Sequence, residues 1–306
     1  MLSPEARQRL HQLEFRSKKR VEELLQGGYA SLFKGQGLEF AEVREYIPGD
    51  DVRYLDWNVS ARFGKPFVKL NEEERELTLM FLVDASASME CGGGLGSKAD
   101  LAAQLVALLS FAALRFGHKV GMLRFAERVE RYVEPRKGQQ HIMRILGEVM
   151  SSASLGRGTD IEAALRYFYR IHPRRAVVFL LSDLLIDDAP ECFLSGHQAG
   201  AGESVLERFL RLSCRRHQLS VLRLVSPLER QMPSVGKVRW RDAESGRTLS
   251  VDTSSAAWRQ RYAVHMANLS SAWGGLVRSS GGSYAEFSSA EDPLENLLAF
   301  MRRVKC

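Results

Sequence analysis

Five oxygen-bearing side chains fall in three short segments of the sequence, two of which directly follow or end an apolar run. These side chains are Asp84, Ser86, Ser88, Thr159 and Asp183. Oxygen ligands without histidine or cysteine suit a hard cation such as Mg²⁺ or Mn²⁺, and Mg²⁺ is held at about 2.0 to 2.1 Å with several waters retained. Two carboxylates and three hydroxyls undersupply such an ion, which leaves a position for a carboxylate from another protein.

Short apolar runs that alternate with helical patterns predict a doubly wound α/β fold, with a mostly parallel sheet buried on both faces. We expect strands at 77–83, 120–125, 129–133, 176–182, 220–225 and 283–287. We expect helices at 98–116, 139–150, 160–171, 203–217, 256–273 and 293–304. In the common strand order 3-2-1-4-5-6, the first and fourth strands flank the switch point where open α/β sheets bind ligands, and both aspartates lie there.

The remaining elements depart from this parallel pattern. Only residues 126–128 separate the second and third strands, so that pair should be an antiparallel hairpin and one edge strand should run backwards. A second hairpin is predicted within an insertion at about 228–253. Ser3 and Pro4 favour a first helix that ends before Gly27. Residues 34–74 read as loops and short strands, and we divide the chain into an amino-terminal segment, 1–76, and a sheet domain, 77–306.

Composition indicates a globular protein. The chain has 306 residues, of which 45% are hydrophobic and 26% charged, and its net charge of +6 is too modest for a nucleic-acid-binding signature. Its four cysteines are widely spaced, which predicts neither a disulfide framework nor a zinc site. The longest apolar stretch, 101–114, is shorter than the roughly 20 residues that cross a bilayer, and the amino terminus lacks an apolar signal region. We therefore expect no transmembrane segment and a cytoplasmic location.

The five oxygen-bearing residues also carry a resemblance. Their D-x-S-x-S spacing, with the later threonine and aspartate, resembles the metal-ion-dependent adhesion site (MIDAS) of von Willebrand factor A domains. Upstream, Gly37-Leu38-Glu39-Phe40, the run from Val43 to Arg53 and Asp56-Trp57-Asn58 resemble the signature of the DUF58 family, which carries such a domain. The resemblance spans about Gly35 to Asp188.

This resemblance implies a von Willebrand factor A-like domain, preceded by a family-specific segment, that binds proteins through Mg²⁺ or Mn²⁺ and is not an enzyme. It further implies a MoxR-type AAA+ ATPase as partner, with the pair maturing or remodelling other proteins. In the signature segment, arginines and acidic residues alternate around Tyr46, Tyr54 and Trp57, a mixture suited to buried ion pairs against aromatic walls. Such a segment would dock the amino-terminal region onto the sheet domain or offer a surface to a partner.

Other functions stay open at this point. An aspartate after an apolar strand also begins haloacid dehalogenase-like phosphatases, although Ser86 stands where those enzymes have a second acid. The run from Gly92 to Lys98 invites a nucleotide-loop interpretation, but it begins too far from the strand end and lacks the glycine that a Walker loop has before its lysine. The basic cluster at 16–20 leaves phosphate or nucleic-acid binding as an alternative.

Overall fold

A six-stranded sheet forms the centre of the computed structural model, which describes residues 4–25, 43–52, 55–69, 76–91, 96–151, 158–185, 204–241, 246 and 248–304. The strand order is β10-β7-β6-β3-β4-β5. The strands are β3 (Thr78–Asp84), β4 (Lys119–Phe125), β5 (Val129–Arg136), β6 (Val177–Ser182), β7 (Gln218–Val225) and β10 (Ser283–Ser288). This is the predicted order read from the opposite edge, so the doubly wound fold and the neighbouring positions of the first and fourth predicted strands are confirmed.

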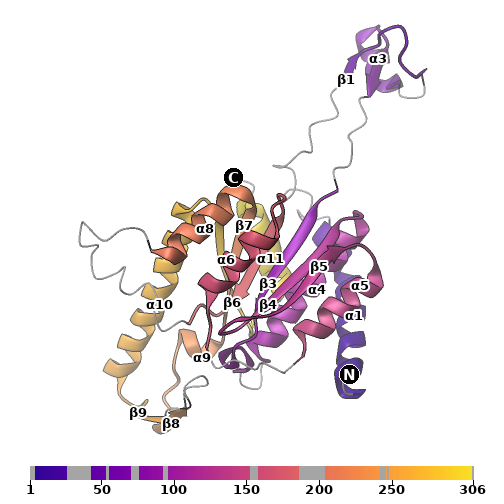
Figure 1. Cartoon of the computed structure of the whole chain (residues 1–306). Coiled ribbons are helices and arrows are strands. Elements are labelled where there is room, and N and C mark those ends of the chain that lie inside the picture. Colours follow the sequence, from indigo (N-terminus) through magenta and orange to yellow (C-terminus); the bar gives the residue numbers. More distant parts are fainter. Residues whose placement is uncertain are drawn as a thin grey trace.

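Side chains alternate across the sheet, and each face is covered by its own helices (Figure 1). Along β3, Leu79, Phe81 and Val83 enter one core, whereas Met80 and Leu82 enter the other. The first core is closed by α4 (Lys98–Arg115), α5 (Gln139–Val149) and α11 (Pro293–Val304). The second is closed by α6 (Ile161–Ile171), α8 (Val205–Arg216) and α10 (Ala256–Ser279). Burial on both faces explains why the strands read as nearly continuous apolar runs.

Both predicted hairpins are present. β4 and β5 pair antiparallel and β5 forms one edge of the sheet, whereas the other neighbouring strands of this sheet pair parallel. β8 (Lys237–Arg241) and β9 (Thr248–Asp252) pair antiparallel and follow the short helix α9 (Pro227–Arg230). Figure 1 shows this hairpin at the same end of the molecule as α9.

Helix α10 is longer than predicted, ending at Ser279 rather than at Trp273. Gly274 and Gly275, which directly follow the predicted end, both lie inside the helix. A Cβ at Gly274 would lie 3.1 Å from the Tyr284 ring of β10 and 2.9 Å from the Arg278 guanidinium. Glycine therefore permits the close approach of α10 to the sheet at that position.

Helix α1 (Pro4–Leu24) packs on α4 and α5 and extends the first core. Val21 and Leu24 are buried in this contact. The basic cluster on the helix makes ion pairs: Lys18 contacts Glu14, and Arg20 contacts Asp292 at the start of α11. These contacts show a structural use for part of the cluster.

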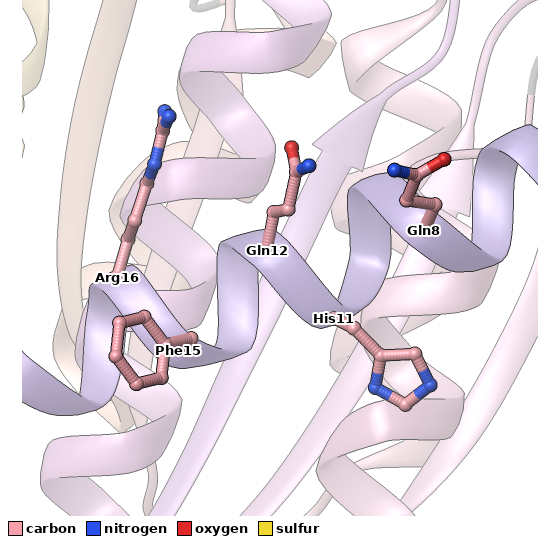
Figure 2. Close-up of a pocket in the computed structure, with 5 residues that line it drawn as sticks. All are labelled: Gln8, His11, Gln12, Phe15 and Arg16. Atoms are coloured by element: carbon pink, nitrogen blue, oxygen red, sulfur yellow. The ribbon is translucent and has the colours of Figure 1, made fainter.

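The outward side of α1 carries a shallow hollow (Figure 2). It is lined by Gln8, His11, Gln12, Phe15 and Arg16. Its only large apolar side chain, Phe15, is exposed, and the hollow involves none of the five predicted site residues.

Across the described parts of the chain, no helix combines the length and apolar composition needed to span a bilayer.

Residues 43–69 form a small unit of β1 (Val43–Glu45), α3 (Trp57–Phe63) and β2 (Phe67–Lys69), which Figure 1 draws away from the sheet. The helix α3 was not predicted. Asp56 caps its amino terminus by accepting hydrogen bonds from two backbone N–H groups, and Gly64 ends it with a φ of 67°. Both signals are present in the sequence, but the helix is too short for a periodic pattern to reveal it.

The signature segment does not bury its ion pair as expected. Arg44 donates two hydrogen bonds to the Asp50 carboxylate, at 2.7 and 2.6 Å, and both side chains remain partly exposed. This pairing lowers the pKa of Asp50. Trp57 is 73% exposed on α3. Within the described part of the unit, the aromatic ring is therefore available at the surface.

Two buried histidines should make stability depend on pH. His172 and His217 end α6 and α8 and lie against Phe168, with ring centroids 5.4 and 5.0 Å from its ring. Burial, together with the His172 charge, lowers the pKa of His217 to about 4. Because the unfolded histidine titrates near 6.5, the unfolded state binds more protons between these pH values, and stability falls as the pH decreases through this window.

We therefore expect the free energy of unfolding of the wild type to fall by roughly 2 kcal/mol more between pH 7 and pH 5 than that of His217→Gln. Urea unfolding followed by circular dichroism at both pH values measures the difference. Parallel pH profiles for the two proteins would show that His217 is not held neutral by burial.

Candidate metal centre

Asp84, the last residue of β3, places a buried carboxylate at the carboxyl edge of the sheet. Only 3% of the residue is exposed. Its Oδ1 accepts a hydrogen bond from the backbone N–H of Ser86 at 2.8 Å, and its Oδ2 accepts one from the hydroxyl of Ser182 at 2.6 Å. One bond comes from its own loop and the other from the end of β6. The carboxylate is thus fixed across the junction of the two central strands.

Asp183 follows β6 and is fully buried beside this junction. The next residue, Leu184, has a φ of 59°, a left-handed conformation that is uncommon for a residue with a side chain and costs about 1 kcal/mol. In this turn, the Leu184 N–H donates to Ser182 Oγ at 3.0 Å, and the Leu185 N–H donates to Asp183 Oδ1 at 3.1 Å. The strained turn therefore holds both polar side chains at the strand end in place.

The two serines of the motif lie next to Asp84. Ser86 precedes a short 3₁₀ helix, η3 (Ala87–Glu90), which contains Ser88. Both serines are buried, and their hydroxyl oxygens are 3.1 Å apart. This helical turn is what brings two side chains, two residues apart in sequence, onto the same side of the loop.

Thr159 lies at the same carboxyl end of the strands as Asp84, because its loop is hydrogen-bonded to the residue that follows β4. The backbone N–H of its neighbour Asp160 donates to the carbonyl of Ala126, just beyond β4, at 2.8 Å. The Asp160 carboxylate caps α6, which fixes the loop that carries Thr159. Because β4 pairs with β3 up to Asp84, all five predicted site residues lie at one edge of the sheet, as expected from their positions in the sequence.

The electrostatics of this edge favour a cation. Burial, reinforced by the charge of Asp183, raises the pKa of Asp84 to about 7, although the hydrogen bonds from Ser182 and Ser86 oppose the shift. A cation between the two carboxylates would offset both the burial of the Asp84 charge and its repulsion by Asp183. Among the described residues, no three His, Cys, Asp or Glu side chains gather as metal ligands. The donor set, two carboxylates with hydroxyls, fits a hard divalent ion that keeps some of its waters.

The sequence analysis missed one cation at this edge. Lys98, the first residue of α4, is fully buried, and its ammonium lies 2.6 Å from Asp183 Oδ2 and 2.5 Å from Glu229 Oε1 of α9. Ser182, which orients Asp84, was missed as well. Lys98 follows a glycine-rich run and opens a largely apolar helix, and neither feature predicts the carboxylate partners that it has.

The structure also shows the surroundings of the residues on which the phosphatase and nucleotide-loop interpretations depend. Ser86, at the position where haloacid dehalogenase-like phosphatases have their second acid, shares a hydroxyl contact with Ser88. Residues 92–95 of the glycine-rich run lie outside the described residues. Lys98, which closes that run, pairs with two carboxylates.

Comparison with known proteins identifies the family. The family described as "Protein of unknown function DUF58" matches residues 42–271. Uncharacterized proteins of Mycobacterium bovis and Mycobacterium tuberculosis are 30% identical over 297 residues, which cover 95% of this chain and 87% of theirs. The chain belongs to the DUF58 family. The resemblance of the signature segment to the DUF58 family is thereby confirmed.

Several solved structures resemble this DUF58 protein more distantly. An aerotolerance-related membrane protein from Bacteroides fragilis is 17% identical, with a TM-score of 0.47, over 74% of this chain and 99% of its own. BatB from Bacteroides thetaiotaomicron is 18% identical, with a TM-score of 0.42, over 74% and 98%. The SpRpn10 VWA domain is 10% identical, with a TM-score of 0.40, over 73% and 94%. The strand order and antiparallel edge of this chain are those of the predicted von Willebrand factor A-like fold.

Proposed function

We propose that this DUF58 protein is a non-enzymatic protein-binding module whose binding depends on a divalent cation, Mg²⁺ or Mn²⁺. The observation that carries the proposal is the meeting of the Asp84 and Asp183 carboxylates, both buried, at the edge where β3 and β6 end. The Lys98 ammonium supplies one positive charge against the carboxylates of Asp84, Asp183 and Glu229, and a divalent ion shared by the two aspartates would offset the negative charge that remains.

In this proposal the five predicted residues hold the ion. Asp84 and Asp183 supply negative charge, while Ser86, Ser88 and Thr159 supply neutral oxygens. When bound, the ion acts as a Lewis acid that accepts a further oxygen ligand. Because the protein ligands are mostly neutral, the ion keeps enough positive charge to attract a Glu or Asp side chain presented by another protein. The chain's part is to hold the hydroxyls and carboxylates in position before the partner arrives.

The identity of the binding partner is also part of this proposal. Membership in the DUF58 family favours a MoxR-type AAA+ ATPase, with the pair acting in maturation or remodelling of other proteins, in the cytoplasm. The exposed Trp57 of α3 offers a second surface for such a partner, separate from the metal centre.

A capture experiment tests the proposal. Immobilised wild type in Mg²⁺ should retain a purified MoxR-type ATPase or one of its client proteins, and chelation by EDTA should release it. Asp84→Ala should capture neither in either buffer, because one of the two charged ligands is gone. Asp252→Ala, which removes an exposed carboxylate at the end of β9, is the matched control and should behave as wild type. Capture by wild type that persists in EDTA, or capture by Asp84→Ala that persists in EDTA, would contradict the proposal.

A further inference from the structure

Lys98 lies where a lysine is least expected. Its side chain is fully buried, and removing an ammonium from water is costly unless it is well paired. It also opens α4, where the helix dipole disfavours positive charge. A capping box between Ser97 and Asp100 fixes this first turn, so the lysine is held in position by its own helix. Two unfavourable terms must therefore be offset by its partners.

Those partners are two carboxylates that the backbone orients toward the ammonium. Asp183 uses Oδ1 to accept from the Leu185 N–H and presents Oδ2 to Lys98 at 2.6 Å. Glu229 uses Oε2 to accept from the Ser226 N–H, in the capping box of α9, and presents Oε1 to Lys98 at 2.5 Å. Each carboxylate thus has one oxygen on the backbone and the other on the lysine.

Lys98 and the divalent ion would therefore compete for the carboxylate of Asp183. In the proposed function Asp183 binds the divalent ion, but one of its oxygens already accepts a hydrogen bond from Lys98. Glu229 gives the ammonium a second partner outside the predicted ligand set. When ionised, the three carboxylates Asp84, Asp183 and Glu229 against one ammonium leave two negative charges, which one divalent ion balances.

We propose that Lys98 is a built-in competitor of the divalent ion: its ammonium holds Asp183 when the ion is absent, is kept by Glu229 when the ion binds, and thereby weakens ion binding. This inference rests on the proposed function and adds to it a reason why the centre would bind its ion reversibly. A module that captures and releases partners needs such reversibility.

Two variants separate the effect of removing the competing ammonium from the effect of changing the local charge. Lys98→Met replaces the side chain with an apolar one of similar length and leaves the local charge one unit more negative. The double variant Lys98→Met with Glu229→Gln removes the lysine and also restores the wild-type local charge. Lys119→Met is the matched control, because Lys119 makes a partly exposed ion pair with Glu76 at the start of β4, away from the metal centre.

The measurement is a titration with Mn²⁺ alone, in which electron paramagnetic resonance reports the free ion. We expect both Lys98 variants to bind Mn²⁺ at least about tenfold more tightly than wild type, and Lys119→Met to bind like wild type. Circular dichroism, recorded with and without Mn²⁺, verifies that each variant is folded. If Lys98→Met folds only with Mn²⁺, the double variant supplies the comparison.

The possible results distinguish a failure of the proposed competition from a failure of the proposed metal centre. Wild-type binding with no tightening in either variant would overturn the competition and leave the metal centre standing. Tightening in Lys98→Met but not in the double variant would assign the effect to charge alone and also overturn the competition. Binding by the Lys98 variants but not by wild type would support the competition. Absence of Mn²⁺ binding in all of the proteins would overturn the metal centre itself, and the inference with it.

Discussion

Asp84→Asn should weaken Mn²⁺ binding by at least about 100-fold, since even partners that only orient metal ligands change affinity by about 10- to 100-fold. The asparagine keeps Oδ1 to accept the hydrogen bond from the Ser86 N–H, so the loop should retain its shape. What it removes is one of the two charges that would hold the ion. Isothermal titration calorimetry with Mn²⁺ measures the loss.

The same substitution should not destabilise the protein in EDTA. The raised pKa of Asp84, about 7, means that its ionised form is disfavoured in the folded protein without a cation. Removing the charge therefore relieves an unfavourable interaction with Asp183. Mn²⁺ should raise the melting temperature of the wild type and leave that of Asp84→Asn unchanged, because ligands stabilise only the state that binds them. Equal Mn²⁺-induced shifts in the two proteins would place the ion elsewhere.

Asp183→Ala should lower the free energy of unfolding by about 3 kcal/mol in EDTA, because breaking a buried ion pair leaves a poorly compensated charge. Lys98 and Asp183 are both fully buried, and after the substitution Glu229 alone faces the ammonium. Relief of the repulsion between Asp183 and Asp84 offsets only part of this loss. Urea unfolding followed by circular dichroism gives the value.

The matched control is an ion pair at the surface. Glu76 contacts Lys119 at 3.0 Å with both side chains well exposed, and such pairs contribute only about 0.2 to 1 kcal/mol. Glu76→Ala should therefore change stability far less than Asp183→Ala. If the two substitutions cost the same, the interaction between Lys98 and Asp183 is exposed to solvent and the description of the buried pair is wrong.

The sheet was largely predictable because its determinants are local. Burial on both faces makes each central strand an apolar run, and the three residues between β4 and β5 permit only a hairpin. The order of the strands then follows from the usual handedness of the connections. One element that we predicted too short is α10, which continues past Trp273 through Gly274, and the reason for a glycine there, the neighbouring Tyr284 ring, is visible only in the folded structure.

The five predicted residues of the candidate site could be found from the sequence, whereas Lys98 could not. A motif places Asp84, Ser86 and Ser88 within five residues, and the strand ends place Thr159 and Asp183. Lys98, in contrast, meets Asp183 and Glu229 across 85 and 131 residues of sequence. The glycine-rich run before this lysine invited a nucleotide-loop interpretation that its position and spacing did not fit, and nothing in the surroundings of Lys98 along the chain indicates two carboxylate partners.

The most direct test of the metal centre is anomalous scattering from crystals of the wild type soaked in Mn²⁺. We predict a manganese peak at the carboxyl edge of the sheet, among the five predicted site residues. Soaks of Asp84→Asn crystals should lack it. A map in which manganese is absent from this edge in the wild type, at concentrations that fill other sites, would contradict the account.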